Sequence, residues 1–117
     1  DITHFVKQGD HLKAAQELQA TLSRLLKPDD VRTYVEVTLG AAQHLISFGL
    51  DRRFSEHPDH HAGMARTVRQ RGHPSIADAL VELEHLRLGR WYGHRGNGQT
   101  IERCDELLDL IETWAVA

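Results

Sequence analysis

Apolar residues recur at spacings of three and four along most of this 117-residue chain, and that spacing is typical of amphipathic α-helices. The first such run, within residues 9–26, is formed by Leu12, Ala15, Leu18, Leu22 and Leu25. Few segments show the strict alternation of a half-buried strand. The pattern therefore predicts an all-α protein.

Five helices are expected, over residues 9–26, 30–50, 60–71, 74–92 and 100–114. Pro28 ends the first, and Asp29 or Asp30 is expected to cap the second by accepting from free backbone N–H groups. The segment VRTYVEV contains β-branched residues that favour a strand, but its apolar spacing continues into AAQHLI and favours a helix. Five helices with short connections predict an up-and-down helical bundle.

Length and composition indicate one globular domain. Hydrophobic residues make up 40% of the chain and charged residues 26%, which is ordinary for a soluble domain. The chain begins at Asp1 and not at Met, so two origins stay open for this single domain over residues 1–117, a trimmed product or a domain excised from a longer chain. No apolar run approaches the roughly 18 residues of a membrane span, and no secretory signal is visible. We therefore expect no membrane association and a cytoplasmic location, which the single cysteine, Cys104, also favours.

Positive charge gathers in one part of a chain whose formal net charge is −3. Residues 52–95 carry eight arginines and no lysine against five acidic side chains, together with six of the nine histidines. The guanidinium group suits phosphate and carboxylate groups because it binds them in planar, bidentate geometry. This distribution predicts a local site for an anionic partner.

The segment RLGRWYGHRGNG, residues 87–98, concentrates these features at the end of the fourth predicted helix. Arg87 follows Leu83 by four residues, so we expect it on the packing face of that helix. Two interpretations fit the spacing. Arg87 could hold a phosphate beside His94, a residue type that transfers protons near neutral pH. Alternatively, the cluster could be a helix end with arginines in its last turn and a glycine-rich stop.

Three features of the chain resemble the HEPN family, the all-helical domain named for higher eukaryotes and prokaryotes nucleotide-binding. The second predicted helix ends in AAQHLISFGL, a histidine-containing loop SEHPDHHAG follows, and LEHLRLGRWYGH then matches an Arg-x(4–6)-His motif. The motif residues are Arg87 and His94, separated by six residues. The resemblance covers about residues 9–114.

The resemblance implies a homodimer formed through the motif helices that binds RNA or a nucleotide. Active members are metal-independent ribonucleases of toxin or defence type, which need no cofactor. By the same resemblance, Arg87 and His94 are the expected catalytic residues. Substrate contacts are expected from Arg90, Trp91, Tyr92 and Arg95, with a nucleotidyltransferase or an antitoxin as protein partner.

Two alternatives stay open at the level of sequence. Leu88 follows the motif arginine where active members often carry a polar residue, so the domain could be an inactive interaction domain that docks a partner protein. The loop EHPDHH offers ligand types for zinc, nickel or copper in His57, His60 and His61. Adventitious surface histidines explain this loop more simply, so we expect no metal.

Overall fold

The computed structural model describes residues 2–25, 29–58, 61–89 and 96–117, with side chains given from residue 9 onward. These residues form five helices and no strand, which confirms the all-α prediction. The helices are α1 (Ile2–Leu22), α2 (Val31–Phe54), α3 (Met64–Gln70), α4 (Pro74–Arg87) and α5 (Asn97–Val116).

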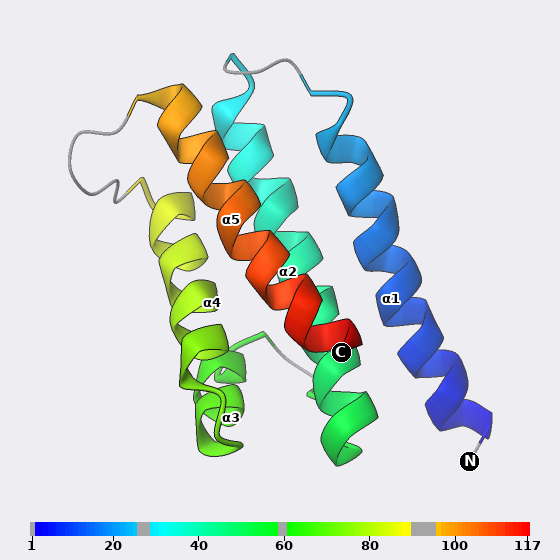
Figure 1. Cartoon of the computed structure of the whole chain (residues 1–117). Coiled ribbons are helices and arrows are strands. Elements are labelled where there is room, and N and C mark those ends of the chain that lie inside the picture. Colours follow the sequence, from blue (N-terminus) through cyan, green and yellow to red (C-terminus); the bar gives the residue numbers. More distant parts are fainter. Residues whose placement is uncertain (1, 26–28, 59–60, 90–95) are drawn as a thin grey trace.

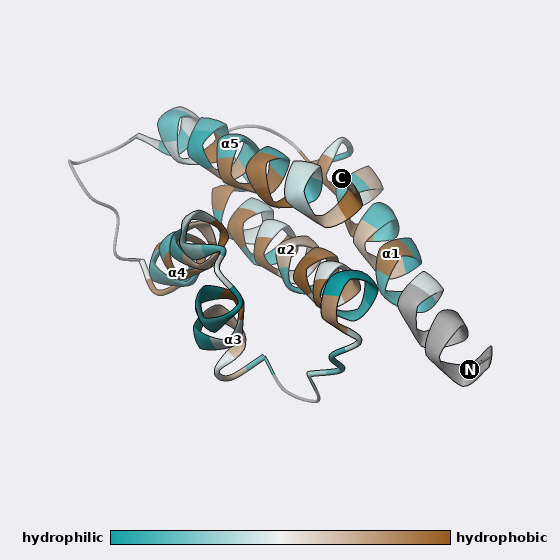
Figure 2. Ribbon diagram, turned by 60° about the horizontal axis from the view of Figure 1, so that its bottom comes forward, coloured by the Kyte–Doolittle hydropathy of each residue, from teal (hydrophilic) through white to brown (hydrophobic). Residues whose placement is uncertain are grey.

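Four long helices run alternately up and down, as predicted, and the short α3 packs against α4 at one end of the bundle (Figure 1). Helix α2 is central, because α1, α4 and α5 all pack against it. Figure 2 shows these three helices around α2, with hydrophobic residues facing the interior. Helix α1 packs mainly on α2, and Gln19 adds a hydrogen bond to Glu112 of α5.

Several helix boundaries differ from the predicted ones. Helix α1 begins at Ile2 and ends at Leu22, α2 continues to Phe54, α3 is shorter at both ends, and α5 begins at Asn97. Asp30 occupies the N-cap position of α2, but its side chain makes no capping hydrogen bond. The extension of α2 is supported by tertiary contacts, since Arg52 and Arg53 donate hydrogen bonds to carbonyls at the end of α5.

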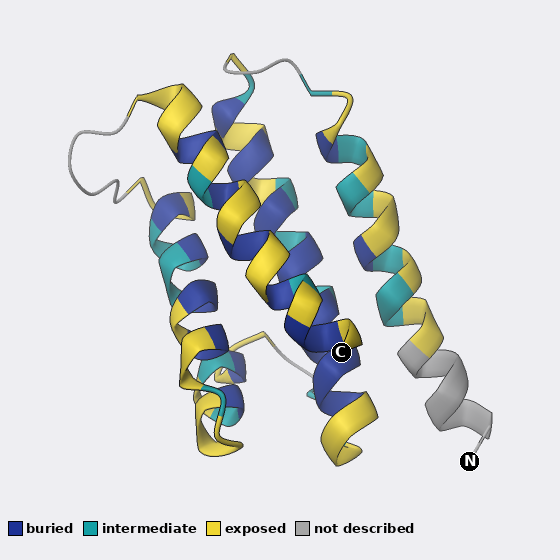
Figure 3. Ribbon diagram, viewed as in Figure 1, coloured by how far each residue is buried: buried dark blue, intermediate teal, exposed yellow. Residues whose placement is uncertain are grey.

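The core is continuous and centres on α2. Its fully enclosed side chains include Leu45, Ile46 and Leu50 of α2, Leu80 and Leu83 of α4, and Ile111 of α5. Figure 3 shows buried residues along the facing sides of these helices and exposed residues outside. Cys104 of α5 is completely buried, and burial raises the pKa of its thiol to about 12.

The lower end of the bundle in Figure 1 depends on a close approach between α2 and the Trp114 ring of α5. A Cβ atom at Gly49 would lie 2.4 Å from the ring of Trp114, so no side chain fits there. Arg53 lies over the same ring, 5.0 Å from its centroid, and donates a hydrogen bond to the Trp114 carbonyl at 2.6 Å. Arg52 donates to the Ala115 carbonyl, so two arginines of α2 satisfy backbone groups at the end of α5.

Replacing Gly49 tests this close approach. A glycine-to-alanine change inside a helix ordinarily stabilises a protein by up to about 1 kcal/mol. Here we expect Gly49→Ala to destabilise the fold by about 1–3 kcal/mol, because the new methyl group overlaps the Trp114 ring. The matched control is Gly9→Ala in α1, where a Cβ meets nothing within 4 Å and the ordinary gain is expected. Urea unfolding of both variants measures the difference, and a stabilising Gly49→Ala would contradict the packing described.

Candidate functional site

The fourth helix ends at Arg87, five residues before the predicted end near Tyr92. Gly89 has a φ of 76°, in the left-handed region that glycine adopts without strain, and its N–H donates to the Leu86 carbonyl at 3.0 Å. The N–H of Leu88 donates to the carbonyl of Glu84. A glycine stop of this kind was predicted, but it comes at Gly89 and not at Gly93.

Arg87 lines hollows together with residues of α2, so it lies on the side of α4 that packs against α2, but it is exposed and not buried. Leu83 and Leu86 of the same helix are buried. The physical reason for the difference is that Arg87 is the last residue of α4, where its long side chain can reach solvent. Arg87 is therefore available to a ligand.

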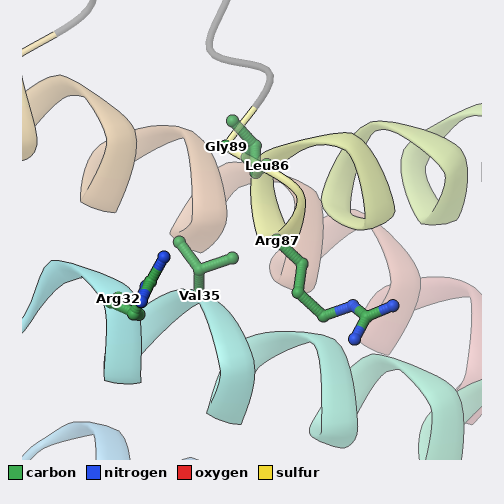
Figure 4. Close-up of a pocket in the computed structure, with 5 residues that line it drawn as sticks. All are labelled: Arg32, Val35, Leu86, Arg87 and Gly89. Atoms are coloured by element: carbon green, nitrogen blue, oxygen red, sulfur yellow. The ribbon is translucent and has the colours of Figure 1, made fainter.

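Arg87 borders a groove between α2 and α4. Arg32, Val35, Leu86, Arg87 and Gly89 line its upper part, where Val35 and Leu86 form apolar walls (Figure 4). In Figure 4 the Arg87 side chain reaches from the end of α4 across α2, and Val35 appears between it and Arg32.

A second hollow adjoins the first, with Arg87 common to both. Its lining is Glu36, Leu39, Gly40, Gln43, His61 and Arg87. We call the two hollows together the α2–α4 groove. Arg32, Glu36, His61 and Arg87 are all exposed, so the groove is open to solvent and carries both signs of charge.

Three arginines elsewhere in the described chain pair with carboxylates. Arg69 pairs with Asp78 at 2.6 Å, and Arg71 pairs with Glu56. Arg103 lies between two carboxylates, Glu82 at 2.6 Å and Glu106 at 2.8 Å, and these hydrogen bonds raise its pKa. In contrast, Arg32 and Arg87 form no ion pair with any residue that the structure describes. A cation without a carboxylate partner can neutralise an anionic ligand at lower cost.

The other predicted site residues lie outside the described residues. These are Arg90, Trp91, Tyr92, His94 and Arg95. They follow Gly89 directly in the sequence, and Gly89 lines the α2–α4 groove. Of the predicted catalytic pair, the structure thus locates Arg87 alone.

Sequence reasoning missed Arg32, Glu36 and Gln43, and considered His61 only as a metal ligand. Arg32 and Glu36 are separated by four residues, the spacing of neighbours on one helix face. They lie near Arg87 only because α4 packs against α2, and the local sequence does not predict that packing.

The histidine loop forms no recognisable metal centre in the parts of the chain that the structure covers. No three His, Cys, Asp or Glu side chains among them could hold a metal ion together. His57 instead lies with its Nδ1 atom 3.5 Å from Oδ1 of the buried Asp51. His60 lies outside the described residues.

Two further histidines meet across the α1–α2 interface. Nδ1 of His11 lies 3.1 Å from Nδ1 of His44, so one ring donates a hydrogen bond and the other, neutral, accepts it. Both rings are half-buried. Burial lowers the pKa of His44, and the nearby His11 and His61 lower it further.

Comparisons with known protein families, with curated proteins and with solved structures gave no match to this chain. None of the helices described combines the length and the hydrophobicity needed to cross a bilayer. The function of the protein has therefore to be inferred from its own side chains. The α2–α4 groove is the candidate site, because exposed basic and acidic side chains lie together there.

The His11–His44 contact predicts a pH dependence of stability. Because the pKa of His44 is lower in the folded chain than in the unfolded chain, the unfolded state binds more protons below a pH of about 6.5. The stabilisation is present above that pH and is lost as the pH falls. Urea unfolding at pH 8 and pH 5.5 should show a smaller loss of stability for His44→Gln than for the wild type. Equal losses would refute the assignment to His44.

Proposed function

We propose that this all-α domain binds RNA or a nucleotide, with its phosphate groups held in the α2–α4 groove by Arg32 and Arg87. The observation that carries the proposal is the exposure of these two arginines in the groove without a carboxylate partner in the described chain. Both are exposed, both line the groove, and neither pairs with a carboxylate of the described residues. The guanidinium group binds phosphate through paired N–H donors, and the apolar walls beside it reduce competition from water.

The resemblance to the HEPN family supports the same proposal, because Arg87 is the arginine of the motif. Metal-independent cleavage of RNA, with Arg87 and His94 as catalytic residues, is the activity that the resemblance implies and stays a prediction. Arg90, Trp91, Tyr92 and Arg95 are the further substrate contacts on this proposal. A binding role without cleavage uses the same arginines.

Removing either groove arginine should weaken RNA binding. We expect Arg32→Ala and Arg87→Ala each to lower the affinity for a short single-stranded RNA roughly tenfold, because each loses a charge-assisted contact to phosphate. Each should also reduce the slope of log affinity against log salt concentration by about 0.7, the value for one phosphate contact on a single strand. Fluorescence anisotropy over a salt series measures both quantities.

The matched control is Arg66→Ala on α3. Arg66 is exposed and lies outside the groove, so its loss should leave affinity and salt slope nearly unchanged. Equal effects of all three substitutions would indicate non-specific attraction by net charge. No binding by the folded wild type would refute the proposal and favour the alternative, an inactive domain that docks a partner protein.

The proposed homodimer has its own test. Leu88, next to Arg87 at the end of the motif helix, has 58% of its surface exposed. If two copies pair through this helix end, Leu88→Asp should convert the dimer to a monomer, since a charge is costly in an apolar interface. Leu110→Asp on α5, at a position that is 45% exposed, is the control and should leave the dimer intact. Sedimentation velocity distinguishes the states, and a wild-type monomer would contradict the homodimer.

A further inference from the structure

The lower hollow of the α2–α4 groove contains an exposed carboxylate and an exposed imidazole on the same lining as Arg87. Glu36 comes from α2, His61 from the connection that precedes α3, and Arg87 from the end of α4. The three residues are far apart in sequence and meet only through the packing of the bundle. The upper hollow contains Arg32 and Arg87 without a carboxylate or histidine.

The Glu36 carboxylate is not held in an ion pair within the described chain. It forms no ion pair with Arg32 or Arg87, nor with any other residue that the structure describes. Glu56, Glu82 and Glu106 are instead each engaged by an arginine. A carboxylate that is not engaged by an arginine keeps its capacity to accept a proton, which a tightly paired one loses.

We propose that Glu36 and His61 form an acid–base pair that cleaves RNA at a phosphodiester held by Arg87. This proposal rests on the proposed function, because it requires RNA in the groove. Cleavage of RNA by its own 2′-OH needs a base for that hydroxyl, an acid for the leaving oxygen and a cation for the phosphate. The carboxylate, the imidazole and the guanidinium of the lower hollow are suited to these three tasks, and no cofactor is required.

The step is a transesterification in which atoms and charges balance. Glu36 accepts the proton of the ribose 2′-OH as O2′ attacks the adjacent phosphorus. The bond between phosphorus and O5′ breaks, and O5′ takes a proton from the His61 imidazolium. The products are a 2′,3′-cyclic phosphate and a free 5′-OH, and proton exchange with water restores both side chains. Arg87 donates hydrogen bonds to the non-bridging phosphate oxygens throughout.

The experiment separates cleavage from binding. Cleavage of a dye-labelled single-stranded RNA is measured in EDTA for the wild type and for Glu36→Gln, His61→Asn and His94→Asn. Binding is measured on the 2′-O-methyl form of the same RNA, which lacks the attacking hydroxyl. Glu102→Gln, an exposed carboxylate change on α5, is the matched control, and circular dichroism confirms that each variant is folded.

We expect Glu36→Gln and His61→Asn to lose about 10²–10⁴-fold in cleavage rate while keeping their affinity for the methylated RNA within a few-fold. The wild-type rate should pass through a maximum as pH rises, because the base must be deprotonated and the acid protonated. Glu36→Gln should remove the rise on the acidic side, and His61→Asn the fall on the alkaline side. If Glu36 and His61 had purely structural roles, neither substitution would change the acidic or the alkaline side of the pH dependence of the rate.

Three results would overturn the inference. Wild-type rates in Glu36→Gln or His61→Asn would exclude the pair, as would loss of cleavage in His94→Asn with cleavage retained in His61→Asn. Binding of the methylated RNA with no cleavage of any RNA tested would also exclude the acid–base pair, while the proposed binding function would stand. Failure to bind at all would instead refute the proposed function itself.

Discussion

The enclosure of α2 by three other helices is the constraint on which the rest of the structure depends. Residues 45–51 are buried without interruption, so this stretch of the helix has no solvent-facing side. A helix enclosed all round needs neighbours on every face, and small residues let those neighbours approach. Ala41 and Ala42 are fully buried, and Gly49 leaves the room that the Trp114 ring fills.

The first half of α2, in contrast, has one side that its neighbours leave partly open, and this side forms the groove. Arg32, Glu36 and Gln43 are spaced by four and seven residues, so they share one side of the helix, which α1, α4 and α5 leave partly open. Buried Val35 and Leu39 flank that side and reduce its exposure to water. The same packing that closes the core therefore sets a row of polar groups between low-dielectric walls, where their charges act more strongly than on a convex surface.

The sequence predicts the fold class well, because apolar spacing records which side of each helix is buried. That is why VRTYVEV was correctly assigned to a helix despite its β-branched residues. Helix ends were less predictable, as Gly89 stops α4 before the second glycine of the motif is reached. The groove could not be predicted from the sequence. Glu36, His61 and Arg87 come together only through the packing of α4 against α2 and the path of the chain before α3, which no local pattern encodes.

His61 reaches the groove because the chain reverses after α2. Ser55 takes a left-handed conformation, with φ 53°. Its N–H donates to the carbonyl of Asp51 and the N–H of Glu56 donates to the carbonyl of Leu50, which ends the helix and turns the chain. On the near side of the loop, Glu56 pairs with Arg71 and His57 lies beside Asp51. On the far side, the His61 carbonyl accepts from the N–H of Met64, whose side chain is buried. The loop is thus tied to the bundle on both sides, so the position of His61 beside Gln43 depends on contacts at the opposite end of α2 from Arg32.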